Sequence, residues 1–172
     1  MHVRRYWPIL FALTLAVASP HARGKQVPSV TPAEREALTA VVHELDAAYD
    51  AQDVARFVAV FAEGANFQFP VDGLALRGRE EIRQHFAKQF ATLPPFRHVT
   101  TTGDIEFVGP GILAVDVNVD IRAADPKTGA VETLFHYAGL GLGIWTDTGW
   151  RIRLVRLYPA PMNPAPATRT PE

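Results

Sequence analysis

The stretch FHYAGLGLGIWTDTGWRIRLVRLY, residues 135–158, decides the fold that the sequence predicts. Apolar and small residues extend on both sides of a polar turn at residues 146–149, which is the pattern of a long β-hairpin. Trp145 and Trp150 flank the turn as an aromatic pair across the two strands. We therefore expect two long antiparallel strands near the end of the chain.

Side chains alternate between the two faces of a strand, so pairing outward from the turn assigns each residue to a face. One face is predicted to carry Phe135, Tyr137, Gly139, Gly141, Gly143, Ile152, Leu154, Arg156 and Tyr158. The other is predicted to carry His136, Ala138, Leu140, Leu142, Ile144, Arg151, Arg153, Val155 and Leu157. Glycine inside a strand costs stability, so three on one face indicate that a helix or a ligand approaches closely there.

The first 18 residues have the pattern of a secretory signal peptide. Arg4 and Arg5 precede a short apolar run at residues 9–17, and Ala16 and Ala18 form an A-x-A cleavage site. The run is short for a membrane span, which disfavours an uncleaved anchor, and no Cys follows it to carry a lipid. We expect a periplasmic or secreted protein that has no membrane attachment after cleavage.

Composition narrows the classes of partner. The chain of 172 residues has a formal net charge of −1 and no basic cluster, which argues against nucleic acid as a partner. It has 0 Cys, so the exported fold must be held by burial without disulfides. A hydrophobic content of 48% permits this.

The remaining pattern predicts helices first and a meander of strands afterwards. Thr31 and Glu34 form a capping box before a helix with an apolar stripe, and Asp53 caps a second, short helix. A third helix follows Gly78, and period-two alternation begins at Arg97. The order predicts an α+β domain over residues 31–159, preceded by a flexible linker at 19–30 and followed by a disordered Pro-rich tail at 160–172.

Three segments carry a resemblance to a known family. They are VVHELDAAYDAQDVARFVAVFAEGANFQFP at residues 41–70, RGREEI at 77–82 and WTDTGWRI at 145–152. In order and spacing they resemble the nuclear transport factor 2-like superfamily, and within it the SnoaL-like and SgcJ/EcaC-type branch. The resemblance implies a cone: a curved antiparallel sheet whose concave face is covered by three N-terminal helices, also called a cystatin-like roll.

The catalytic residues of the characterised branches do not carry over. The two oxyanion-hole positions of ketosteroid isomerases fall on Leu45 and Gly141, and their general base falls on Phe69. The last-strand Asp of limonene-epoxide hydrolases corresponds to Arg156. A shared fold does not by itself imply a shared reaction, so we assign no catalytic residue and favour a protein that is not an enzyme.

The residues give little support for covalent catalysis, a metal site or a phosphate-binding loop. The serines, Ser19 and Ser29, lie outside the predicted domain, and there is no Cys nucleophile. The domain histidines occur singly, without metal-ligand spacing, and Gly139 to Gly143 lie inside a strand rather than in a phosphate-binding loop. We expect no cofactor and no metal.

Seven residues are candidates for a ligand pocket: Tyr49, Phe67, Phe69, His98, Tyr137, Arg156 and Tyr158. Arg156, predicted on the glycine face, is an anchor for a ligand carboxylate or enolate, or the partner of an internal carboxylate such as Asp46 or Asp72, or exposed at the cavity rim. His98 is either a general base or a hydrogen-bonded histidine at the rim. The aromatic residues either line a pocket or form the core.

The second hairpin face predicts an interface. It would expose Ala138, Leu140, Leu142, Ile144, Val155 and Leu157. Large exposed apolar patches usually mark contact surfaces, so we expect a two-fold homodimer formed sheet against sheet. In the alternative, the sheet coils strongly and the tail covers the patch.

Three functional hypotheses follow. The first is binding of a small, aromatic or anionic organic molecule in the cone, without catalysis. The second is an isomerase, cyclase or hydrolase that uses His98 and Arg156. The third is a structural or protein-interaction module whose cavity is filled by its own side chains, which a cavity below a few hundred Å³ would favour.

Overall fold

The computed structural model describes residues 29–94 and 96–161. The predicted signal peptide, nearly all of the predicted linker and most of the predicted tail lie outside these residues. Within them, no helix is both long and apolar enough to cross a membrane.

Three α-helices have the starts that the sequence predicts. Helix α1 spans Pro32–Asp50 and begins with the Thr31–Glu34 capping box, in which each side chain bonds the other residue's backbone amide. Helix α2 spans Val54–Ala59, and its cap Asp53 accepts a hydrogen bond from the amide of Arg56 at 3.0 Å. Helix α3 spans Gly78–Thr92. Because these caps satisfy free amides at the helix starts, they fix where α1 and α2 begin.

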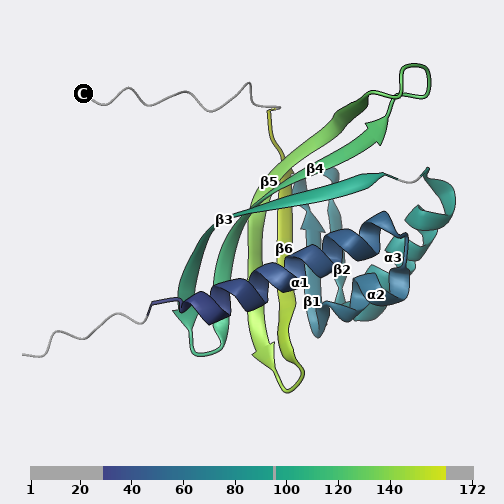
Figure 1. Ribbon diagram of the computed structural model, residues 1–172. Coiled ribbons are helices and arrows are strands. Elements are labelled where there is room, and N and C mark those ends of the chain that lie inside the picture. Colours follow the sequence, from purple (N-terminus) through teal and green to yellow (C-terminus); the bar gives the residue numbers. More distant parts are fainter. Residues whose placement is uncertain (1–28, 95, 162–172) are drawn as a thin grey trace, which may run out of the picture.

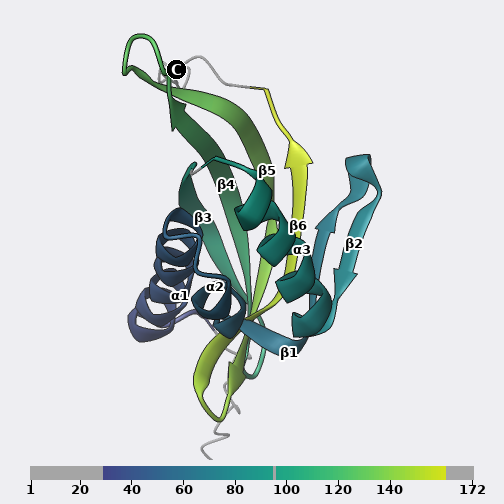
Figure 2. The ribbon, with the colours of Figure 1, turned by 90° about the vertical axis from the view of Figure 1, so that its right-hand side faces the viewer.

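Six strands form one sheet in the order β2-β1-β6-β5-β4-β3. Their bounds are β1 Phe61–Phe69, β2 Leu74–Arg77, β3 Arg97–Gly109, β4 Ile112–Ala124, β5 Val131–Thr146 and β6 Gly149–Pro159, with a 3₁₀ turn η1 at Pro70–Asp72. The predicted α+β cone is confirmed, although one pair of strands, β1 and β6, is parallel. The sheet curves around the helices, with α1 against β3 and α3 against β1 and β2 (Figures 1 and 2).

The predicted register of the β5–β6 hairpin is correct from the turn as far as Gly143 and Ile152. Farther from the turn it is wrong. Leu142 pairs with Leu154 but Gly143 pairs with Ile152, so Arg153 has no partner on β5 and forms a β-bulge. An extra residue shifts all later residues of a strand to the opposite face. Arg156 therefore pairs with Leu140 rather than Gly139.

This shift corrects several predicted positions. Leu154, Arg156 and Tyr158 lie on the convex face of the sheet, not on the glycine face. Val155 and Leu157, predicted on the outer patch, face the helices instead, and Leu157 is 3% exposed within the core. The outer apolar patch is therefore smaller than the sequence predicts.

The three glycines of β5 do admit close neighbours, as predicted. A Cβ at Gly143 would lie 2.7 Å from a methyl group of Leu38 on α1, and one at Gly141 would lie 2.9 Å from a methyl group of Val115. A Cβ at Gly139 would overlap the backbone carbonyl of Arg156. Helix α1 and the neighbouring strands, rather than α3, thus use the space that the missing side chains leave.

We expect Gly139→Ala to lower the free energy of unfolding by about 1–3 kcal/mol, because the added methyl meets rigid backbone and forces the two strands apart. Urea denaturation of the purified protein measures this. The matched control is Gly109→Ala, also in a strand, where a Cβ meets nothing within 4 Å. Its effect should stay within about 0.5 kcal/mol; equal losses for the two variants would contradict the close approach.

Candidate functional site

A cavity of ≈ 480 Å³ lies between the concave face of the sheet and the helices. Its walls are mostly apolar and come from α1, α2, α3 and all six strands, among them Leu38, Val42, Leu45, Phe86, Val115, Val117 and Val119. Two of the strand glycines, Gly141 and Gly143, form part of the lining. This volume lies within the usual range of small-molecule sites, roughly 300–1,000 Å³.

Five of the seven candidate pocket residues line this cavity: Tyr49, Phe67, Phe69, His98 and Tyr137. The other two, Arg156 and Tyr158, do not, because the bulge at Arg153 places them on the convex face. Arg156 is exposed there and donates a hydrogen bond to Oε1 of Gln68 at 2.9 Å. The prediction that Arg156 faces the cavity, whether as a ligand anchor or as an internal ion pair with Asp46 or Asp72, is therefore wrong.

The aromatic residues of the cavity belong to the core and to the lining at the same time. Phe69 contacts Phe67 and Tyr137 with ring centroids 5.3 Å and 5.2 Å apart, and Tyr49 meets Phe90 edge to face at 5.2 Å. Edge-to-face packing of this kind holds each ring in a defined orientation.

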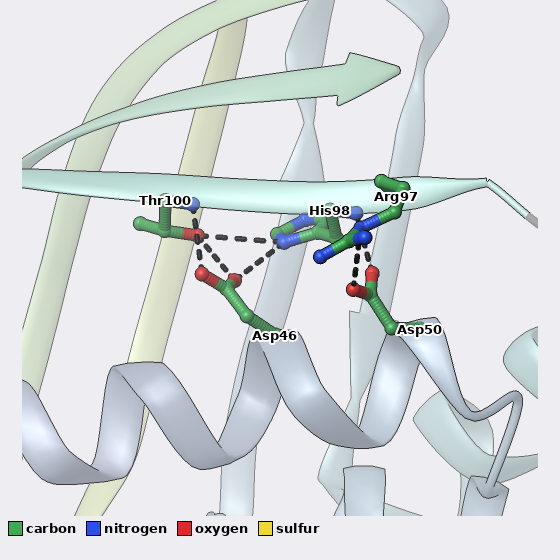
Figure 3. A network of polar contacts seen from close by, with 5 residues as sticks. All are labelled: Asp46, Asp50, Arg97, His98 and Thr100. Carbon is green, nitrogen blue, oxygen red and sulfur yellow. Dashed lines mark hydrogen bonds and ion pairs between the residues drawn. The ribbon is translucent and has the colours of Figure 1, made fainter. Parts of the chain in front are cut away.

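A polar network at one wall connects α1 to β3 (Figure 3). One oxygen of Asp46 lies 2.6 Å from Nδ1 of His98 and accepts a bond from the Thr100 hydroxyl at 2.7 Å; the other accepts from the Thr100 amide at 2.8 Å. One turn later, Asp50 accepts from the His98 amide at 2.6 Å and pairs with Arg97 at 3.3 Å. Residues four apart share a helix face, so both carboxylates meet β3.

The network determines how His98 presents its ring. The Asp46 carboxylate accepts the proton of Nδ1, so in the neutral ring Nε2 carries the lone pair. No residue in the described part of the chain hydrogen-bonds Nε2. His98 lines the cavity and packs against Tyr49, with ring centroids 4.6 Å apart. A group inside the cavity can therefore exchange a hydrogen bond or a proton with this ring.

Two phenols provide hydrogen-bond donors in the same cavity. Burial raises the pKa of Tyr49, and the nearby Tyr137 and Asp50 raise it further. Burial likewise raises the pKa of Tyr137, with a contribution from Asp72. Both hydroxyls consequently stay protonated at neutral pH and are able to donate to an oxygen of a ligand.

Helix α3 adds two polar side chains one turn apart, His85 and Gln89, which the sequence analysis did not assign to the site. Burial lowers the pKa of His85, and the charge of Lys88 adds to this, so the ring is neutral at pH 7. The Oε1 atom of Gln89 is buried and accepts no hydrogen bond from the described residues. An acceptor of this kind is costly when it is left alone, so a hydroxyl of a bound molecule would stabilise it.

The contact between Asp46 and His98 was not predicted. The two residues are 52 positions apart, and no local pattern connects them. The one available signal was a pair of acidic residues, Asp46 and Asp50, four apart on α1, whose apolar stripe packs under a strand. In residues 29–94 and 96–161, no three His, Asp or Glu side chains converge as metal ligands would.

The family assignment rests on a match to the SnoaL-like domain model over residues 42–158, more than half of the chain. This chain belongs to the SnoaL-like domain family. The predicted resemblance to the nuclear transport factor 2-like superfamily is thereby confirmed. No curated protein matches the sequence.

Solved structures share the fold at low sequence identity. A cystatin-like protein of unknown function from Nostoc punctiforme is 16% identical with a TM-score of 0.66, covering 80% of this chain and 98% of its own. A ketosteroid isomerase-like protein from Erwinia carotovora atroseptica is 17% identical (TM-score 0.62; 78% and 100% covered). A putative scytalone dehydratase from Novosphingobium aromaticivorans is 15% identical (TM-score 0.64; 74% and 85% covered).

We expect Asp46→Ala to lower the free energy of unfolding by about 2–4 kcal/mol, because it leaves two Thr100 donors and the His98 ring without their acceptor. Urea denaturation measures this change. Glu44→Ala on the same helix removes only an exposed ion pair with Arg56 and should cost less than about 1 kcal/mol. An Asp46 variant as stable as the Glu44 variant would show that the network does not hold α1 to β3.

Proposed function

We propose that the domain binds a small, neutral, ring-shaped organic molecule in the cavity between the helices and the sheet. The observation that carries this proposal is the cavity itself, ≈ 480 Å³ with mainly apolar walls and a few polar groups. Apolar walls supply most of the binding free energy for such ligands, while isolated polar groups orient them. The volume also argues against a module whose cavity is filled by its own side chains.

The charge of the lining favours a neutral ligand over an anionic one. Among the described residues no Lys or Arg lines the cavity, whereas Asp72 does. An anionic ligand would lose its hydration without gaining a fixed cation in exchange. Tyr49, Tyr137 and His98 instead suit a carbonyl or hydroxyl oxygen on an aromatic or polycyclic body.

Binding is testable with β-naphthol, a neutral, fluorescent bicyclic alcohol. We expect saturable binding of one molecule per domain, which a fluorescence titration measures. Val117→Phe, which adds volume at a lining position, should weaken binding at least about tenfold by occupying the space of the ligand. The control is Val108→Phe, at a residue 57% exposed and outside the lining, which should leave affinity unchanged. Equal affinity for wild type and both variants would contradict binding in the cavity.

A second candidate function, proton transfer on the bound molecule, is favoured by one further observation. His98 is held by Asp46 at 2.6 Å with Nε2 free among the described residues, the arrangement of a general base whose ring is oriented by a carboxylate. Nε2 would take a proton from a carbon beside a ligand carbonyl. Tyr49 and Tyr137 would donate hydrogen bonds to the oxygen as negative charge develops on it. Arg156 has no part in this scheme.

Hydrogen exchange distinguishes this candidate from binding alone. We expect the protein to accelerate deuterium incorporation from heavy water at the α-carbons of β-tetralone, a neutral bicyclic ketone, monitored by NMR. His98→Gln should reduce the acceleration about 100-fold, in line with the usual contribution of a general base. Circular dichroism and β-naphthol binding establish that the variant remains folded. Exchange at the uncatalysed rate, with β-tetralone shown to bind, would leave a binding protein without this activity.

A further inference from the structure

A second hollow, of ≈ 470 Å³, lies where the start of β1 meets the turn between β5 and β6, at one end of the sheet (Figure 2). None of its lining residues also lines the cavity. Its charged lining residues are three arginines and two acids, namely Arg79, Arg151, Arg153, Glu63 and Asp147. The cavity has no Lys or Arg in its described lining, so the two spaces differ in charge.

An irregular segment of β1 forms one wall of this hollow. Between two paired positions, β1 has residues 62–65 where β6 has only Arg153. The extra residues cannot all pair, so they loop away from the ladder. Two arginines hold the loop by its carbonyl groups, because Arg79 donates to the carbonyl of Phe61 at 2.6 Å and Arg153 donates to that of Gly64. The loop thereby fixes where these two guanidinium groups stand.

The three guanidinium groups keep most of their hydrogen-bond donors. An arginine has five N–H groups. Among the described residues, Arg79 bonds through two of its nitrogens, and Arg151 and Arg153 each bond through one. Nε of Arg151 is buried and has no acceptor in the described part of the chain. A charged donor in that state is costly, and an anion against the outer nitrogens of the same guanidinium would offset part of the cost.

The acids of the hollow neutralise only one of the arginines. Glu63 pairs with Arg79 at 2.8 Å. Arg151 and Arg153 make no ion pair within residues 29–94 and 96–161, and neither does Asp147, which is exposed on the turn. Three arginines against two acids leave an excess of positive charge in one place. Such an excess, with free donors, favours an anionic ligand.

We propose that this hollow binds a phosphoryl group, as inorganic phosphate or as the phosphate ester of a small molecule. The planar fork of arginine fits the oxygens of phosphate and carboxylate alike. Here the donors come from two elements, Arg79 from α3 and the pair Arg151 and Arg153 from β6, so they reach an anion from different directions. A tetrahedral phosphoryl group directs oxygens to several sides, whereas a carboxylate presents both of its oxygens in one plane. The volume also leaves room for an organic group on the phosphate.

Isothermal titration calorimetry of the purified protein with inorganic phosphate tests the site. We expect one phosphate per chain with a Kd below about 1 mM at low ionic strength. Arg151→Gln should weaken binding at least about tenfold, because it removes a charged donor of the hollow. The matched control is Arg156→Gln, on the same strand and outside the hollow, which loses the same charge and should change the Kd less than about twofold. Circular dichroism establishes that both variants are folded.

Two outcomes of this titration would overturn the site. The first is wild-type protein that shows no saturable binding up to about 10 mM phosphate. The second is an equal loss of affinity in Arg151→Gln and Arg156→Gln, since binding would then follow the net charge of the protein rather than this hollow.

Phenyl phosphate and benzoate identify the ligand chemistry, because they attach a phosphate and a carboxylate to the same ring. We expect benzoate to bind at least about tenfold more weakly than phenyl phosphate, and equal affinity would overturn the phosphoryl assignment. Phenyl phosphate that binds more tightly than inorganic phosphate identifies an ester as the ligand, whereas equal affinity identifies the free ion.

The site is separable from the cavity by the same titration. Val117→Phe, which fills space in the cavity, should leave the affinity for phosphate unchanged, and phosphate should not displace β-naphthol. A Val117→Phe variant that loses phosphate binding while remaining folded would place the anion in the cavity and overturn the second site.

Discussion

The organisation of both faces of the sheet depends on one unpaired residue, Arg153. Without this bulge, strict alternation would send Arg156 toward the helices and Leu157 toward solvent, burying a charge and exposing a core residue. The guanidinium of Arg153 donates to the backbone carbonyl of Gly64, where the pairing of β1 with β6 is also irregular. Because an unpaired buried charge is expensive, the bulge keeps the interior of the cone apolar.

The cavity also depends on how α1 is held to β3. Packing of apolar side chains alone leaves a helix some freedom to slide along a sheet, whereas Asp46 and Asp50 bond to particular backbone amides of β3. Those bonds set the position of α1 along the strand. The same Asp46 carboxylate orients the His98 ring, so the contact that holds α1 to β3 also sets the orientation of a ring in the cavity wall.

The cavity and the convex face of this small domain differ in their chemistry. The concave side holds aromatic rings, two protonated phenols and an oriented imidazole around an apolar space, features suited to holding a neutral ring and acting on a carbonyl. The convex side holds aliphatic side chains between Asp116, which has no ion-pair partner among the described residues, and Arg156, which bonds to Gln68. Each face can be altered by substitution without touching the other.

Local pattern determined much of the architecture. The capping box at Thr31, the cap at Asp53, the Trp145–Trp150 hairpin and the period-two strands depend on near neighbours in the chain, and so they were predictable. The positions of Arg156 and of Asp46 were not. The position of Arg156 depends on a bulge, and the one sign of it in the local sequence is the adjacent apolar pair Leu154 and Val155. Asp46 contacts His98 only after helix and sheet have packed. Contacts between residues far apart in sequence arise from that packing. For this reason only the tertiary structure decided which polar groups line the cavity and which residues lie on the outer face of the sheet.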